Sequence, residues 1–400
     1  MTSRSTLRQI PRSVWALGFV SLLMDMSSEM IHGLLPVFLV GVLGASAMMV
    51  GLIEGAGEGL ALIVKVFSGA LSDYWGKRKP LTVLGYGLGA LSKPLFAIAP
   101  SAGFVLFARL TDRVGKGIRG APRDALIADI VPSELRGAAF GLRQSLDTVG
   151  AFIGPLIGLG LMLLWHDDFR AVFWVAIVPG VLAVALLFLG VQEPERPRAE
   201  VRSNPVTRAN LRRLPSSYWW VVGIGALFTL ARFSEAFLIL RVAQGGLPVA
   251  WSPLVLVAMN VVYALAAYPL GKLSDRVSHV KLLALGLLIL VGADLLLAWS
   301  ARGAWVWSGI ALWGLHMGMT QGLLARMVAD GAPADLRGTA YGFFNLMSGI
   351  ALLVASALAG FLWDRYGAPQ TFIAGAAFSV LTLVAMAFRP GVSRSPVGAA

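Results

Sequence analysis

The sequence predicts an all-α membrane protein with twelve transmembrane helices in two pseudo-symmetric six-helix bundles, and three observations support this fold class. Apolar residues make up 57% of the 400 residues and charged residues only 14%, and the mean hydropathy is +0.75. Apolar stretches of roughly 20 residues, long enough to cross the hydrocarbon core as helices, occur twelve times. The chain also repeats itself at a long interval. We therefore expect a lipid bilayer as its solvent and a doubled unit as its architecture.

An internal repeat relates the two halves of the chain. Residues 128–141 read ADIVPSELRGAAFG, and residues 329–342 read ADGAPADLRGTAYG. A second pair, GALSD at 69–73 and GKLSD at 271–275, has nearly the same spacing of about 200 residues. This period is too long for a solenoid repeat, and it fits a membrane protein built from two homologous halves.

The expected helices lie six on each side of one long polar segment, centred near Leu23, Leu60, Leu88, Ile118, Pro155 and Leu182, and then near Leu230, Val262, Leu288, Leu315, Leu352 and Val380. We expect an N-terminal bundle over residues 1–191, a basic cytoplasmic linker over 192–217 and a C-terminal bundle over 218–400. The first apolar stretch, 14–42, is longer than the hydrophobic part of a signal peptide and lacks a convincing cleavage site, so we expect it to span the membrane.

The net charge of +12 comes from basic residues in loops and not from one continuous patch, which argues against a nucleic-acid partner. By the positive-inside rule, both termini and the linker are expected in the cytoplasm of a multi-pass protein of the bacterial inner membrane. The chain has no cysteine, no H-E-x-x-H zinc motif and no phosphate-binding glycine loop. The sequence therefore predicts neither an enzyme nor a cofactor.

Residues 69–79, GALSDYWGKRK, resemble the signature loop between helices two and three of the major facilitator superfamily, and the resemblance covers the whole chain. The second copy keeps its glycine and aspartate but loses the second glycine. The resemblance implies a cytoplasmic gate that holds the outward-facing state, and a functional monomer. It assigns the gate to Gly69, Asp73, Gly76, Lys77, Arg78 and, in the second copy, Asp275.

Residues 150–158, GAFIGPLIG, resemble the antiporter motif of that superfamily. Gly150, Gly154 and Gly158 leave one helix face bare for close packing, and Pro155 permits a bend. In exporters of the family this stretch lies at the interface between the halves, so the resemblance favours export.

A narrower resemblance links residues 25–30, DMSSEM, and 115–124, GKGIRGAPRD, to a bacterial branch of exporters that includes some nickel-resistance permeases. Those proteins can carry a histidine-rich tail. Residues 389–400 contain no histidine, which argues against a metal substrate.

Ionisable side chains within membrane helices are costly unless they face the bundle interior or water, so each is a functional candidate. Asp25, Glu29 and His32 fall within about 60° of one another on the first helix. This group is suited to taking up a proton or to holding a divalent cation. The alternative is a structural role, in which its hydrogen bonds only pin neighbouring helices.

Glu54 and Glu58 are one turn apart on the second helix and cannot both be charged cheaply. Either one of them holds a proton, or cations of the fourth helix neutralise them. The fifth helix carries one further buried carboxylate, Asp147, which we expect to pair with an arginine of the fourth helix.

The fourth helix is the most charged span, with Asp112, Lys116, Arg119, Arg123 and Asp124. Their counterparts in the second copy are all uncharged: Trp313, Met317, Thr320, Leu324 and Ala325. The fold therefore does not require these charges, and they are the best candidates for proton coupling and solute binding. The alternative is a set of ion pairs that only assembles the N-terminal half.

Together these features predict a secondary active transporter, most simply a proton-coupled antiporter that exports a small solute by alternating access. The expected partners are a small molecule or ion, protons and lipid. One alternative is efflux of a divalent transition metal, nickel or iron, through Asp25, Glu29, His32 and His316. A second alternative is a uniporter or an uptake symporter. The sequence does not identify the substrate.

Overall fold

A computed structural model describes residues 9–194, 211–274, 276–320, 322–333 and 336–388. Within these residues every regular element is a helix. The expected gate residue Asp275 and most of the expected linker lie outside this described part.

The N-terminal half consists of long helices joined by short turns. Several helices begin at a side chain that accepts a hydrogen bond from the first turn: Ser46 from Met49 N–H, and Asp168 from Ala171 N–H. The elements are α2 (Arg12–His32), α3 (Leu35–Val37), a π-helical turn (Phe38–Val42), α4 (Ala47–Trp75), α5 (Lys79–Ile98), α6 (Ala102–Ile130), a 3₁₀ turn (Ser133–Leu135), α7 (Arg136–Leu164) and α8 (Phe169–Gly190).

The C-terminal half repeats this plan. Two of its spans, the seventh and the tenth of the whole chain, are each divided into two helices. The seventh span is interrupted between Ala231 and Ala236, and the tenth near Gly322, whose φ is +77°. The elements are α10 (Ser216–Ala231), α11 (Ala236–Gln244), a 3₁₀ turn (Val249–Trp251), α12 (Pro253–Ser274), α13 (His279–Trp299), α14 (Gly303–Thr320), α15 (Leu323–Gly331), α16 (Arg337–Tyr366) and α17 (Ala368–Ala387).

Ten spans in the described chain are long and apolar enough to cross a membrane. The two remaining expected spans are α6, which carries many charges, and α14, an 18-residue helix that contains three tryptophans and a histidine. With these two helices the order of elements is that of the expected twelve-helix, two-bundle fold.

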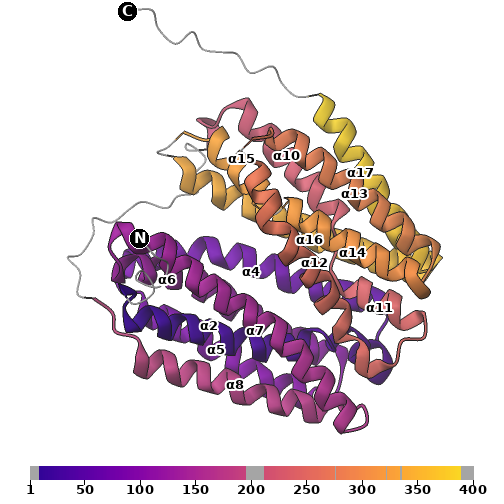
Figure 1. The fold of residues 1–400 in the computed structure, drawn as a ribbon, viewed down its shortest axis with the longest axis horizontal. Coiled ribbons are helices and arrows are strands. Elements are labelled where there is room, and N and C mark those ends of the chain that lie inside the picture. The colour runs from indigo at the N-terminus through magenta and orange to yellow at the C-terminus, as the bar shows by residue number, and fades with distance from the viewer. Residues whose placement is uncertain (1–8, 195–210, 275, 321, 334–335, 389–400) are drawn as a thin grey trace, which may run out of the picture.

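The two halves meet along α4 and α16, which run antiparallel (Figure 1). Small residues bring the two backbones together: Gly51 lies against the Ser356 carbonyl, and Gly59 against Gly349. These contacts cover the first half of α4. The bundles diverge toward the end that carries the start of α2 and the end of α8 (Figure 1). The backbones of the two halves are therefore in contact at one end, called the closed end below, and diverge at the other, called the open end.

The glycines of the expected antiporter motif pack within the N-terminal half. A Cβ at Gly150 would collide with the Leu22 backbone, and one at Gly154 would meet Met26. Both contacts are with α2, whereas the neighbouring Ala151 faces the opposite half in a cavity wall. In this state the bare glycine face therefore serves the α2–α7 contact and not the interface between the halves.

Candidate functional site

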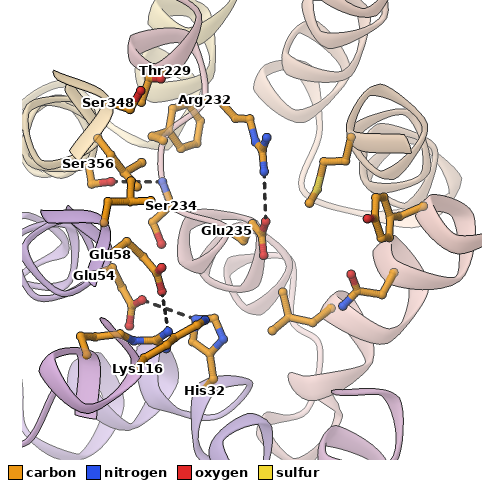
Figure 2. Close-up of a pocket in the computed structure, with 18 of the residues that line it drawn as sticks. His32, Glu54, Glu58, Lys116, Thr229, Arg232, Ser234, Glu235, Ser348 and Ser356 are labelled. Carbon is orange, nitrogen blue, oxygen red and sulfur yellow. Dashed lines mark hydrogen bonds and ion pairs between the residues drawn. The ribbon is translucent and has the colours of Figure 1, made fainter. Parts of the chain in front are cut away.

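A cavity of about 660 Å³ lies between the two halves, near the middle of the helices. Figure 2 shows its walls facing one another, with His32, Glu54, Glu58 and Lys116 from the N-terminal half opposite Arg232 and Glu235 from the C-terminal half. The remaining polar lining is Glu29, Arg113, Thr229, Ser234, Asn260, Tyr263, Ser348 and Ser356. Both halves therefore contribute polar groups to one chamber.

The N-terminal wall is built around Glu54, which is only 1% exposed. Arg109 of α6 donates a hydrogen bond to its carboxylate. His32 bridges two carboxylates, with Nε2 3.4 Å from Glu54 Oε2 and Nδ1 3.2 Å from Glu29 Oε2. The predicted Glu29–His32 pair thus continues from α2 into α4 and α6.

Arginines of α6 also neutralise Glu58. Its Oε1 lies 2.9 Å from Nη1 of Arg113, and 3.7 Å from Arg109. Of the two possibilities left open for the α4 glutamates, the structure has the one in which α6 cations neutralise both. Each acid is held by an arginine that the second half of the repeat lacks.

A buried lysine that the sequence analysis overlooked lies behind this wall. Lys93 of α5 is 1% exposed, and its ammonium donates to Asp112 at 2.7 Å and to Ser28 Oγ at 2.9 Å. The available signal was a lone lysine in the apolar stretch 80–98. Asp112 is therefore paired within the bundle and does not face the cavity.

Toward the open end, α6 carries two more arginines in polar surroundings. Arg119 stacks over the Tyr86 ring at 4.6 Å, and its guanidinium lies 3.9 Å from Asp25. Arg123 pairs with Asp124 at 3.0 Å. The predicted α6 cluster is thus divided into separate pairs along the helix, and Asp25 belongs to a different pair from Glu29 and His32.

Two cations contribute positive charge to the cavity wall from opposite sides. Lys116 is exposed to the cavity, and within the described chain it forms no ion pair. Arg232 lies in the break between α10 and α11, with Nη2 3.9 Å from Glu235. Arg232 and Glu235 therefore form an ion pair on an interrupted backbone instead of a regular helix.

Asp147 lies in a second cavity of about 600 Å³ between α7 and α12. The two cavities share Ala151, Asn260 and Tyr263 as lining residues. Asp147 pairs with Arg143 of its own helix at 3.4 Å, in place of the expected α6 arginine.

The metal-efflux alternative is not supported. His316 is fully buried behind Phe228, whose ring stacks on it at 5.5 Å, and its Nδ1 is 2.8 Å from the Gly286 carbonyl oxygen. It therefore does not meet His32 across the cavity. Nowhere in the described chain are three histidine or acidic side chains arranged to hold a metal ion.

Asp294 of α13 is a second charged residue that the sequence analysis missed. It is completely buried, and neither carboxylate oxygen has a hydrogen-bond partner among the described residues. A Cβ at Gly375 would lie 2.7 Å from this carboxylate and 2.9 Å from the Phe233 ring, so its surroundings are apolar and tightly packed. An ionised carboxylate is costly in such a place, so the neutral acid fits it better.

The gate motif ties helix ends together at the open end. Arg78 Nε donates to Asp129 at 2.8 Å, which joins the motif to the repeated segment, and a second Arg78 nitrogen donates to Ser72 at 2.9 Å. Gly76 has a φ of +64° and ends α4, a conformation that favours glycine. Gly69 lies against Ala121, and Lys77 is exposed. The Asp73 side chain lies outside what the structure describes.

Two helical bundles around a charged chamber, in a chain of membrane-spanning helices, define a membrane transporter. The Major Facilitator Superfamily profile matches residues 17–356, and the chain belongs to this family.

Relatives support the same family. An MFS-type transporter of Methanocaldococcus jannaschii is 33% identical over 389 residues, which cover 95% of this chain and 96% of the relative. The inner membrane transport protein YajR of Escherichia coli is 23% identical, over 93% and 82% of the two chains. The multidrug resistance protein MdtH of Photorhabdus laumondii is 30% identical over 42% of this chain and 41% of its own.

Solved structures share the fold. The nucleoside transporter NupG superimposes with a TM-score of 0.75 at 12% identity, covering 94% of this chain and 98% of that one. A POT family transporter in complex with 5-aminolevulinic acid gives a TM-score of 0.77 at 14% identity, covering 96% and 99%.

Proposed function

We propose that this transporter is a proton-coupled antiporter that exports a small solute by rocking its two halves around the central cavity. The observation that carries the proposal is the chain of paired charges from Glu29 through His32 and Glu54 to Arg109 at the cavity wall. Such groups are costly in a membrane interior unless they serve a function or pair fully, and Glu29 and His32 also reach the chamber. Partial similarity to a multidrug resistance protein supports export.

The proposed coupling between proton and solute depends on the ion pairs of Glu29, Glu58 and Asp25. A proton on Glu29 removes its charge and weakens its contact with His32, and a proton on Glu58 releases Arg113. A proton on Asp25 acts in the same way on Arg119. The freed cations then bind solute or rearrange, and a proton that binds the two conformations unequally shifts the balance between them.

The proposed orientation places both termini and the linker in the cytoplasm of the inner membrane, with residues 1–191 and 218–400 as the two moving bodies and a monomer as the working unit. With this orientation the open end faces the cytoplasm, where an exporter collects its solute. A cysteine-free chain makes the orientation testable by labelling single cysteines introduced at exposed positions such as Lys77 and Asp167.

The test of function is solute-driven proton movement in liposomes that contain a trapped pH probe, with a panel of carboxylates, zwitterions and organic cations. We expect coupling in the wild type and its loss in Glu29→Gln, Arg119→Ala and Arg123→Ala. The control is Asp167→Asn, in an exposed turn far from the cavity. Wild-type coupling in all three variants would refute the assignment.

The same assay separates the remaining alternative. A uniporter moves solute without protons, and an uptake symporter moves both in the same direction. Counterflow of solute and proton is the result expected of the proposed antiporter.

A further inference from the structure

We propose that Asp364 is a latch residue that holds the two halves together at the closed end and sets the balance between the conformations of the transporter. Its carboxylate, near the end of α16, accepts two backbone hydrogen bonds from the start of α4 in the opposite half. Ala47 N–H donates to Oδ1 at 2.9 Å, and Met48 N–H to Oδ2 at 2.8 Å. Asp364 touches no part of the cavity wall, so it acts through the position of α4.

The contact matches what the start of a helix requires. The first N–H groups of α4 have no partner within the helix, and the helix dipole favours a negative charge beside them. Ser46 accepts from Met49 N–H at 3.2 Å, and its carbonyl accepts from Val50 N–H at 3.1 Å. The Asp364 carboxylate accepts hydrogen bonds from the N–H groups of Ala47 and Met48 in the same turn. The first turn of α4 therefore has a full set of protein acceptors only while the other half is docked.

Close packing of α16 against α4 lets the Asp364 carboxylate reach the first N–H groups of α4. A Cβ at Gly360 would overlap the backbone of Ala47 and Met48, so α16 passes α4 at backbone contact one turn before Asp364. The carboxylate is itself exposed, which leaves the latch free to exchange its protein partners for water when the halves separate.

The antiparallel arrangement of α4 and α16 creates an equivalent place at the opposite end. At the closed end, the start of α4 lies beside the end of α16. Asp364 is two residues before the last residue of α16, and the gate residue Asp73 is two residues before the last residue of α4. The internal repeat does not explain this match, because the repeat pairs Asp73 with Asp275 and not with Asp364.

The start of α4 therefore depends on a carboxylate from the opposite half. Rocking that closes the open end separates the closed end and breaks both Asp364 hydrogen bonds. The structure has the Asp364 latch engaged. Loss of this carboxylate favours the opposite conformation.

The test uses a single reporter cysteine, Thr229→Cys, in the cavity of the otherwise cysteine-free chain. Vesicles of both orientations are treated with a membrane-impermeant maleimide. We expect Asp364→Ala to speed labelling from the closed end about 2- to 30-fold, the range for loss of a helix cap, and to slow labelling from the open end. Asp364→Asn keeps one carbonyl acceptor and is expected to fall between wild type and alanine.

Arg365→Gln is the matched control, since it changes the charge of the next exposed residue without altering the cap. Unchanged labelling in both Asp364 variants overturns the proposal. Labelling that rises equally from both ends also overturns it, because that result indicates general loosening. The proposal requires only alternating access, and the readout uses neither solute nor proton, so its failure is distinguishable from failure of the proposed antiport.

Discussion

Helix α6 of the N-terminal half and helix α14 of the C-terminal half occupy equivalent places in the internal repeat, yet their surroundings differ in kind. Around α6 the buried charged side chains are Glu54, Lys93, Arg109, Asp112, Arg113 and Arg119. Around α14, Trp313 takes the place of Asp112 and packs on Phe233, with ring centroids 5.4 Å apart. In the described C-terminal half the buried ionisable groups are Arg241, Asp294 and His316.

This difference separates the requirements of the fold from those of transport. A bundle of this architecture packs around aromatic rings in one half, so it does not need the paired charges that occupy the other. In the proposed antiporter, the charges in the N-terminal half are the coupling groups, and the apolar half is the body against which they move. Substitutions in the two halves test this division.

The largest effect is expected for Arg109→Ala. It leaves Glu54 buried without its arginine, which costs about 3 to 5 kcal/mol of unfolding free energy for a buried pair with one partner removed. Thermal unfolding in detergent measures this loss, and the liposome assay should show no coupling. Its counterpart change, Ile310→Val in α14, should cost only about 0.5 to 1.5 kcal/mol and retain coupling. Similar losses in both variants would contradict the division of roles.

The Lys93–Asp112 pair provides a sharper test. Lys93→Met alone should lower the unfolding free energy by about 3 kcal/mol, because it removes the nearest cation of the buried Asp112 and leaves only Arg113, with Nε 3.5 Å from Oδ2, as an ion-pair partner. Adding Asp112→Leu should recover most of that loss, since an apolar pair fits a buried site about as well as an ion pair. If the charges serve coupling, the stable double variant still fails to couple solute to protons. A stable double variant with normal transport would make this pair part of the scaffold.

Lys116→Met is expected to affect transport with little change in stability. Lys116 has no ion-pair partner within the described chain, so its replacement should change the unfolding free energy by no more than about 0.5 kcal/mol. The apparent affinity for anionic or zwitterionic solutes should fall because the cavity loses an ammonium group. Unaltered affinity across the solute panel would remove Lys116 from the binding site.

The smallest effect is expected at Asp294 in the C-terminal half. Asp294→Asn keeps the shape of the neutral acid, so stability should change by less than about 1 kcal/mol and coupling should persist. Asp294→Leu should be at least as stable, since it removes a buried polar group without a partner. A loss of coupling in Asp294→Asn would show that the apolar half contains a proton site of its own.

Much of this architecture follows from local patterns in the sequence. The repeat and the apolar stretches predicted two helical bundles, and the one-turn spacing of Glu54 and Glu58 predicted neutralisation by α6 as one of two outcomes. These features depend on periodicity within a helix or on comparison of the two copies.

Other features depend on which residues face each other across helices, and one sequence does not encode that directly. Lys93 and Asp294 are single charges in apolar stretches, one fully paired and the other without a partner among the described residues. The interruption of the seventh span at residues 232–235 contains neither proline nor glycine. Asp364 has the appearance of an ordinary residue at a helix end until α4 is placed beside it.

Ser356 connects the α4–α16 contact, the interruption of the seventh span and the central cavity. Its backbone lies against Gly51 where the two halves touch, and its hydroxyl accepts a hydrogen bond at 3.2 Å from Ser234 N–H, in the interruption of the seventh span. It also lines the central cavity. Any sliding of α16 along α4 therefore pulls on the main chain that carries Arg232 and Glu235. This one hydroxyl therefore connects the contact between the halves to the main chain at the cavity wall.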